Sequence, residues 1–180
     1  INSLGFPNKG INSLVEKLSK IRKNHPRKTE PLIGVNIGCN KKSKNKIDDY
    51  IWCLQKVSSL ADYGAINISS PNTPGLRSLQ KKQKLEALLK EISSERTVLE
   101  KKFKIFLPMV IKISPDIDLL LLKSIVELCI KYKLNGIIAT NTTTNKKVLL
   151  KKSEKVPDGG ISGKPLFNNS SNSFSLIIFK

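Results

Sequence analysis

The chain has 180 residues, 39% hydrophobic and 26% charged, a composition that suits a globular protein and excludes global disorder. No apolar run approaches the roughly 18 residues that a membrane-spanning helix needs, and residues 1–5 lack the features of a targeting peptide, so we expect the chain to begin inside a longer protein. The net charge of +18 suggests an anionic partner, but 28 Lys, 4 Arg and 15 Asn are more typical of an AT-rich genome than of a nucleic-acid-binding surface.

Helical and strand-like patterns alternate along the chain. Apolar residues at helical spacing predict helices over residues 11–21, 47–57 and 85–92, the last with a continuation toward Leu99, and a fourth helix over residues 119–129 with Asp116 as its N-cap. Short apolar runs predict strands over residues 32–37, 65–68, 108–113 and 136–140. Strands that alternate with helices predict βα units, an α/β fold and a parallel sheet.

Polar residues follow each predicted strand at its C-terminal end. They are Asn36, then Asn67, Ser69, Ser70 and Asn72, then Lys112, and finally Thr140, Asn141 and Thr142. In barrels and in open parallel sheets the ligand lies at these ends of the strands. One such residue is readily explained as a turn or a cap, but four successive strand ends favour a shared ligand site over independent loop caps.

The residue types limit the chemistry of this predicted site. Asparagine offers a donor beside an acceptor, which suits a flat ligand with alternating C=O and N–H groups, and Lys112 requires an anionic partner if it is buried. The only histidine, His25, lies in a basic loop, which excludes a Ser/His/Asp triad within the chain. We expect no metal site, because His, Cys and carboxylate residues do not cluster, and the sequence contains no P-loop or dinucleotide-binding glycine motif.

Ser70 and three cysteines remain as reactive side chains. A serine hydroxyl is a poor base by itself, but Ser70 could transfer a proton if the ligand made that proton acidic and Lys112 stabilised the developing charge. The alternative is that residues 69–72 form a simple turn. Cys53 and Cys129 are expected in the core and Cys39 in an accessible loop, without zinc-type spacing, which favours a reducing compartment.

Residues 67–77, Asn-Ile-Ser-Ser-Pro-Asn-Thr-Pro-Gly-Leu-Arg, closely resemble the signature of class 2 dihydroorotate dehydrogenases, the flavin enzymes of pyrimidine synthesis. Further segments that match in the same order cover residues 2–6, 34–38, 110–116, 139–143 and 159–166. Class 1 relatives carry a cysteine where Ser70 stands, so the resemblance points to class 2.

The resemblance implies a role for individual residues. Ser70 matches the catalytic base, while Phe6 and Thr73 match residues beside it that shape proton escape. The residues that match the substrate site are Asn2, Ser3, Leu4, Gly5, Phe6, Asn67, Asn72, Asn141 and Thr142. The residues that match the FMN site are Asn36, Asn67, Lys112, Thr140 and Gly163. The family oxidises dihydroorotate to orotate and passes the electrons through FMN to ubiquinone, in mitochondrial members at the inner membrane.

The resemblance also implies a (β/α)₈ TIM barrel, of which this chain would supply roughly strands three to six. Residues 1–167 would be the central part of one FMN-binding domain, and residues 168–180 a Ser/Asn-rich tail that continues the barrel and is truncated. The family's membrane-docking helices would lie outside the chain. Two alternatives stay open at this point: a non-catalytic truncated fragment, and a basic nucleic-acid-binding α/β module, although few aromatic residues and no Arg-rich helix support the latter.

Overall fold

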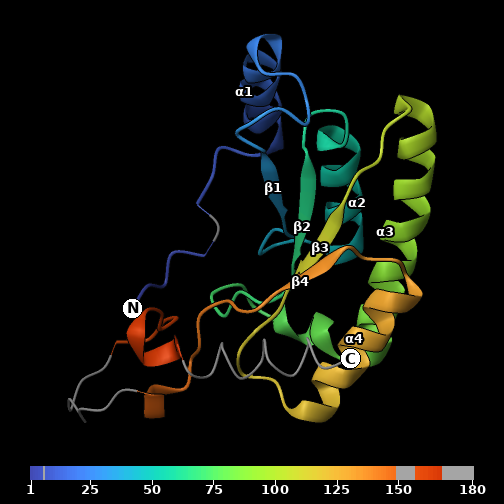
Figure 1. Cartoon of the computed structure of the whole chain (residues 1–180). Helices are drawn as coiled ribbons and strands as arrows, with labels where there is room; N and C mark the ends of the chain where they lie inside the picture. Colours follow the sequence, from blue (N-terminus) through green and yellow to red (C-terminus); the bar gives the residue numbers. More distant parts are fainter. Residues whose placement is uncertain (6, 149–156, 168–180) are drawn as a thin grey trace.

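A computed structural model describes residues 1–5, 7–148 and 157–167. Helices and strands alternate in it, as the sequence pattern predicts (Figure 1). The helices are α1 (Ile11–Asn24), α2 (Lys46–Val57), α3 (Lys82–Phe103) and α4 (Leu119–Lys131), and the strands are β1 (Gly34–Ile37), β2 (Tyr63–Asn67), β3 (Met109–Lys112) and β4 (Gly136–Ile138). Short 3₁₀ turns cover Arg77–Gln80, Lys146–Val148 and Lys164–Leu166.

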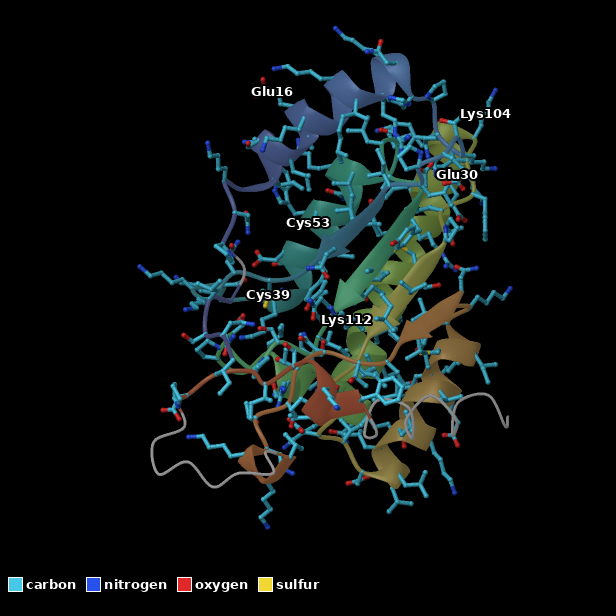
Figure 2. The ribbon with its side chains drawn as sticks, turned by 60° about the vertical axis from the view of Figure 1, so that its left-hand side comes forward. Glu16, Glu30, Cys39, Cys53, Lys104 and Lys112 are labelled. Carbon is cyan, nitrogen blue, oxygen red and sulfur yellow. The ribbon has the colours of Figure 1, made fainter. Side chains whose placement is uncertain are left out.

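The four strands form one parallel sheet in the order β1-β2-β3-β4. The predicted α/β fold with a parallel sheet is therefore confirmed. Because all four strands are parallel, their C-terminal ends lie at the same end of the sheet. Figure 2 shows Cys39 and Lys112 toward this end of the sheet and Glu30 and Lys104 toward the other.

The hydrophobic core lies between the sheet and the helices. Alternate strand residues such as Val35, Ile66 and Ile111 are buried there, because successive side chains of a strand point to opposite faces. α2 packs on α3 and α3 on α4, so these helices cover one face of the sheet (Figure 1). The alternating residues of the opposite face, among them Asn36 and Lys112, are left to line a cleft.

A buried ion pair secures the N-terminal end of the sheet. The carboxylate of Asp62, just before β2, accepts hydrogen bonds from Arg22 Nη2 (2.7 Å), Lys28 N (2.7 Å) and Ile33 N (2.8 Å). Burial raises the pKa of Asp62, but the hydrogen bonds from the Ile33 and Lys28 amides and from Arg22 outweigh it, and the net pKa is lowered. This Asp62 cluster joins α1, the entry to β1 and the entry to β2.

Two details of the sequence interpretation are wrong. α4 is capped by Asp118, whose Oδ1 accepts from Leu121 N at 2.7 Å, and not by Asp116, whose carboxylate is held by distant loops. Cys39 is not accessible: its exposed fraction is 4%, and burial raises the pKa of its thiol. Cys129 is buried as predicted, which raises its pKa to about 12, whereas Cys53 is half-buried.

Candidate active site

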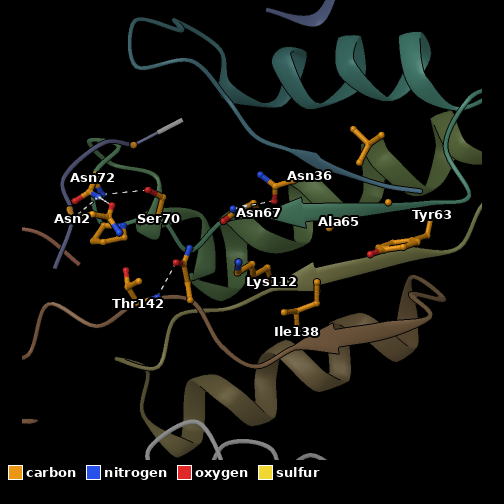
Figure 3. Close-up of a pocket in the computed structure, with 15 residues that line it drawn as sticks. Asn2, Asn36, Tyr63, Ala65, Asn67, Ser70, Asn72, Lys112, Ile138 and Thr142 are labelled. Carbon is orange, nitrogen blue, oxygen red and sulfur yellow. Dashed lines mark hydrogen bonds between the residues drawn. The ribbon is translucent and has the colours of Figure 1, made fainter. Parts of the chain in front are cut away.

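A cleft of about 420 Å³ runs along one face of the sheet to the C-terminal ends of the strands, and Gly34 and Tyr63 at the starts of β1 and β2 also line it (Figure 3). Its wall contains residues from all four strand ends and from the N-terminal segment. The predicted site residues that line it are Asn2, Gly5, Asn36, Asn67, Ser70, Asn72, Lys112, Asn141 and Thr142. The structure thus brings together most of the residues that the sequence singled out.

The remaining predicted residues lie elsewhere. Thr140 and Gly163 line a second hollow, which shares Lys112, Asn141 and Thr142 with the cleft and therefore extends it beyond β4. Ser3 and Leu4 line neither, and Leu4 is 73% exposed. Phe6 lies outside the described residues.

The loop after β2 presents Ser70 to the cleft. Ser70 is 5% exposed, and its Oγ accepts a hydrogen bond from Asn72 N at 3.3 Å, which leaves the Ser70 proton available to another acceptor. Asn72 Nδ2 in turn donates to the backbone oxygen of Asn2 at 3.2 Å. Residues 69–72 are therefore a turn and a wall of the cleft at once, so the two interpretations of this segment do not compete.

A row of hydrogen-bonded amides runs along the floor of the cleft. Asn67 Nδ2 donates to Asn36 Oδ1 at 3.1 Å, and Asn141 Nδ2 donates to Ser69 Oγ at 3.0 Å. The backbone of Asn67 is fixed from the helix side, because the buried Tyr50 hydroxyl donates to its carbonyl oxygen at 2.7 Å.

Lys112 supplies a positive charge beside this row. It is the last residue of β3, the register neighbour of Asn67 on β2, and half-buried. Within residues 1–5, 7–148 and 157–167 its ammonium group has neither an ion-pair partner nor a hydrogen-bond partner. A half-buried cation of this kind favours a ligand that carries negative charge.

Arg77 ties the loops of three strands together. Its Nε donates to Ser69 O (3.2 Å), its Nη2 to Thr142 O (2.9 Å) and its Nη1 to Asp116 Oδ2 (2.8 Å). Asp116 also accepts hydrogen bonds from the Thr143 hydroxyl and from Thr144 N. We call this set, Arg77 with Asp116, the loop clamp, because it fixes the loops after β2, β3 and β4 relative to one another.

The outer wall is formed where the N-terminal segment pairs with a glycine-rich stretch. Asn2 N donates to Gly160 O (3.0 Å) and Gly160 N to Asn2 O (2.7 Å). A Cβ on Gly160 would lie 2.1 Å from Thr142 Oγ1, and Gly159, at φ +145°, would place one 2.4 Å from Asn2 O. Only glycine permits this approach, which explains the two glycines at residues 159 and 160.

The model of the family described as dihydroorotate dehydrogenase matches residues 1–174. The chain belongs to the dihydroorotate dehydrogenase family. Curated relatives named dihydroorotate dehydrogenase (quinone) include that of Aliivibrio salmonicida, 41% identical over 94% of this chain and 49% of the relative, and that of Shewanella baltica, 43% identical over 92% and 48%. The chain thus spans about half the length of the curated relatives it matches.

Solved structures of the family have the same fold. The crystal structure of dihydroorotate dehydrogenase from Eimeria tenella in complex with ferulenol matches with a TM-score of 0.89 at 32% identity, over 99% of this chain and 52% of that one. The ligand-free form from the same organism matches with a TM-score of 0.86. Structures of this family are TIM barrels and its members use a flavin, which favours the flavin-enzyme hypothesis over a nucleic-acid-binding module.

Sequence reasoning missed the roles of Ser69 and Arg77. Both belong to the recognised signature, but their partners Asn141, Thr142 and Asp116 lie 72, 65 and 39 residues away in the chain. The one signal for these two residues in the sequence was that they belong to the signature segment.

Among the described residues no helix is both long and apolar enough to cross a membrane.

Proposed function

We propose that the chain is the part of a quinone-type dihydroorotate dehydrogenase that contains the catalytic base and most of the substrate site. In this proposal residues 1–167 form strands three to six of a (β/α)₈ barrel. The protein oxidises dihydroorotate to orotate in the synthesis of pyrimidine nucleotides. The electrons pass to ubiquinone, and the enzyme acts at a membrane, which is the inner membrane in a mitochondrial setting.

The donor chemistry of the cleft fits FMN. Asn36 and Asn67 both line it, and each has amide N–H groups left for a ligand, since Asn36 uses its oxygen and Asn67 one of its two N–H groups in their mutual bond. Lys112 adds an ammonium group without a partner among the described residues. These groups would suit the carbonyl oxygens of a flavin, and the positive charge of Lys112 would favour a cofactor that gains negative charge on reduction. Thr140 and Gly163 would contact the same cofactor from the adjoining hollow.

Bound FMN would supply the acceptor for the hydride that leaves C6 of dihydroorotate. The residues of the chain do the rest. Ser70 Oγ takes the proton from C5 while its own hydroxyl proton passes to a neighbouring acceptor, and the hydrogen bond from Asn72 N stabilises the partial negative charge on Ser70 Oγ during this transfer. Asn67, Asn72 and Asn141 hold the pyrimidine in place. The buried Thr73 hydroxyl, without a hydrogen-bond partner among the described residues, is available to pass the proton onward.

The observation that carries the proposal is the meeting of Ser70 with the asparagines and Lys112 in one cleft. It is tested by purifying the complete protein, recording its visible spectrum, and mixing it without oxygen with dihydroorotate. We expect a flavin spectrum that bleaches as orotate forms and recovers when a ubiquinone analogue is added. A flavin-loaded protein that produces no orotate would refute the proposal.

A further inference from the structure

The amides of the cleft are joined through Ser69, a residue that does not line the cleft. Ser69 is fully buried, and its Oγ lies 3.0 Å from Asn141 Nδ2 and 2.9 Å from Asn67 Oδ1. Its backbone is held by the loop clamp, since Arg77 Nε donates to its carbonyl oxygen. Ser69 is therefore placed to act on the ligand only through its neighbours.

The direction of every bond in this row follows from two backbone amides. Thr142 N donates to Asn141 Oδ1 at 2.8 Å, and Ser69 N donates to Asn67 Oδ1 at 3.2 Å, so both side-chain oxygens are acceptors. Asn141 must then present its NH₂ group to Ser69 Oγ. The Ser69 hydroxyl, already accepting that bond, must donate its proton to Asn67 Oδ1, and Asn67 must present its NH₂ group to Asn36 Oδ1.

We propose that Ser69 is a positioning residue: its hydroxyl links Asn141 to Asn67 and holds both amides in the orientation that the backbone amides favour, so that Asn36, Asn67 and Asn141 offer N–H groups to the cleft while their oxygens are engaged within the protein. The row is then a donor surface. It selects a ligand edge rich in carbonyl or carboxylate oxygens and disfavours one that presents N–H groups. The inference rests on the proposed function, because it takes the ligand to be a pyrimidine carboxylate with the flavin beside it.

Loss of the Ser69 hydroxyl would remove the acceptor of Asn141 and one of the two donors to Asn67. Each amide would then sample more orientations before binding. The entropy lost when the ligand orders the amide would lower the affinity for the ligand. A net hydrogen bond contributes about 0.5–1.5 kcal/mol, and 1.4 kcal/mol corresponds to about tenfold in affinity. We therefore expect orotate to bind Ser69→Ala about tenfold more weakly than the wild type.

The experiment is a calorimetric titration of orotate into the complete protein. Ser58→Ala is the matched control, because Ser58 is also fully buried but its hydroxyl has no hydrogen-bond partner among the described residues. We expect unchanged affinity for this control. Ser69→Cys, with a side chain of similar size and weaker hydrogen bonding, should lie between the wild type and Ser69→Ala, and provides a second variant if Ser69→Ala does not fold.

A double-mutant cycle distinguishes the positioning role of Ser69 from a general contribution of Ser69 to stability. If Ser69 acts through Asn141, Ser69→Ala should weaken orotate binding much less in an Asn141→Ala background than in the wild type. Equal affinity of the folded Ser69 variants and the wild type, or additive losses in the cycle, would overturn the positioning role. A wild-type protein that does not bind orotate would overturn the proposed function and, with it, the ligand assigned to the row.

Discussion

Ser70, the base in the proposed reaction, is a weak base by chemistry and depends on its position in the cleft. It carries no histidine or carboxylate partner among the described residues; its Oγ accepts only the hydrogen bond from Asn72 N. A serine hydroxyl in this setting removes a proton from C5 only if the hydride leaves C6 in the same step, or if nearby groups stabilise the negative charge that develops on the substrate. In the proposed reaction Lys112 and the donors of the amide row, which line the same cleft, would provide such stabilisation.

Ser70→Ala in the complete protein should slow reduction of the flavin by dihydroorotate by about 10²–10⁴-fold, the usual contribution of a general base. Flavin content should stay near that of the wild type, because Ser70 is assigned to the proton and not to the cofactor. Stopped-flow absorbance after mixing with dihydroorotate measures the rate. Reduction at the wild-type rate would remove Ser70 from the mechanism.

At the scale of elements, the loop clamp links the loops that carry the candidate site to one another. The hydrogen bonds of Arg77 reach the loops after β2, β3 and β4 at once. The planar fork of a guanidinium can satisfy such divergent acceptors, whereas an ammonium group is a single point charge.

Arg77→Lys should therefore keep the charge but lower kcat/KM by about tenfold or more, since hydrogen bonds from charged groups contribute about 1.5–3 kcal/mol each. Backbone amides of residues 69–76 and 142–145 should exchange hydrogen faster than in the wild type. Arg96→Lys is the control, because Arg96 is a buried arginine on α3 that donates to Lys133 O at 3.0 Å, away from the cleft. If both variants lose activity equally, the clamp has no specific role.

The Asp62 cluster holds the other ends of the same elements and makes their stability depend on pH. Its lowered pKa means that the stabilisation is complete above the unfolded value of about 3.9 and is lost as pH falls through the folded value. Breaking a buried ion pair costs about 3–5 kcal/mol. Asp62→Asn should lower the free energy of unfolding by about this amount at pH 7.

The difference between Asp62→Asn and the wild type should shrink as pH falls below about 3.9, because the Asp62 carboxylate takes up a proton first in the unfolded state and then, at its lowered pKa, in the folded state. Urea unfolding of both proteins between pH 7 and pH 3 measures it. A difference that stays constant over this range would show that the charge of Asp62 is not what stabilises the fold.

The sequence predicted the elements well and their long-range contacts poorly. Short apolar runs located all four strands within a few residues, and α3 runs past Leu99 to Phe103. Asp116 was assigned to a local cap because local patterns favour one, whereas Arg77, far away in the chain, takes its carboxylate. The burial of Cys39 depends on packing under α2, which no local pattern encodes. The proposed ligand came from the resemblance of the signature segment to a known family and not from the spacing of the polar residues.

At the scale of the whole molecule, the sheet has two outer strands. β1 and β4 each pair with one neighbour among the described strands, and the sheet face that bears the cleft carries Tyr63, which is 37% exposed. Unpaired strand edges and exposed apolar side chains promote self-association. The barrel phosphate site, which the loops after the seventh and eighth strands usually supply, is not expected within strands three to six.

The 180-residue chain expressed by itself should therefore associate into soluble oligomers or aggregates and bind FMN weakly, without dihydroorotate-dependent reduction of a quinone. Size-exclusion chromatography with light scattering, a visible spectrum and a dye-reduction assay check the three expectations. A yellow, monomeric and active 180-residue protein would contradict them and would show that strands β1–β4 suffice for the function.

The Asp62 cluster lies at the N-terminal end of the sheet and the candidate site residues Ser70 and Lys112 lie at the C-terminal end, and this separation has a consequence for adaptation to temperature. Substitutions around Asp62 and Arg22 change how strongly the N-terminal ends of the strands are held, while the side chains of the proposed ligand site lie at the C-terminal ends. A lineage, or a directed-evolution library, can therefore change heat tolerance through residues 22–33 and 58–62 while turnover remains constant. Selection for a new substrate has to act on the other end, through the loops that Arg77 holds.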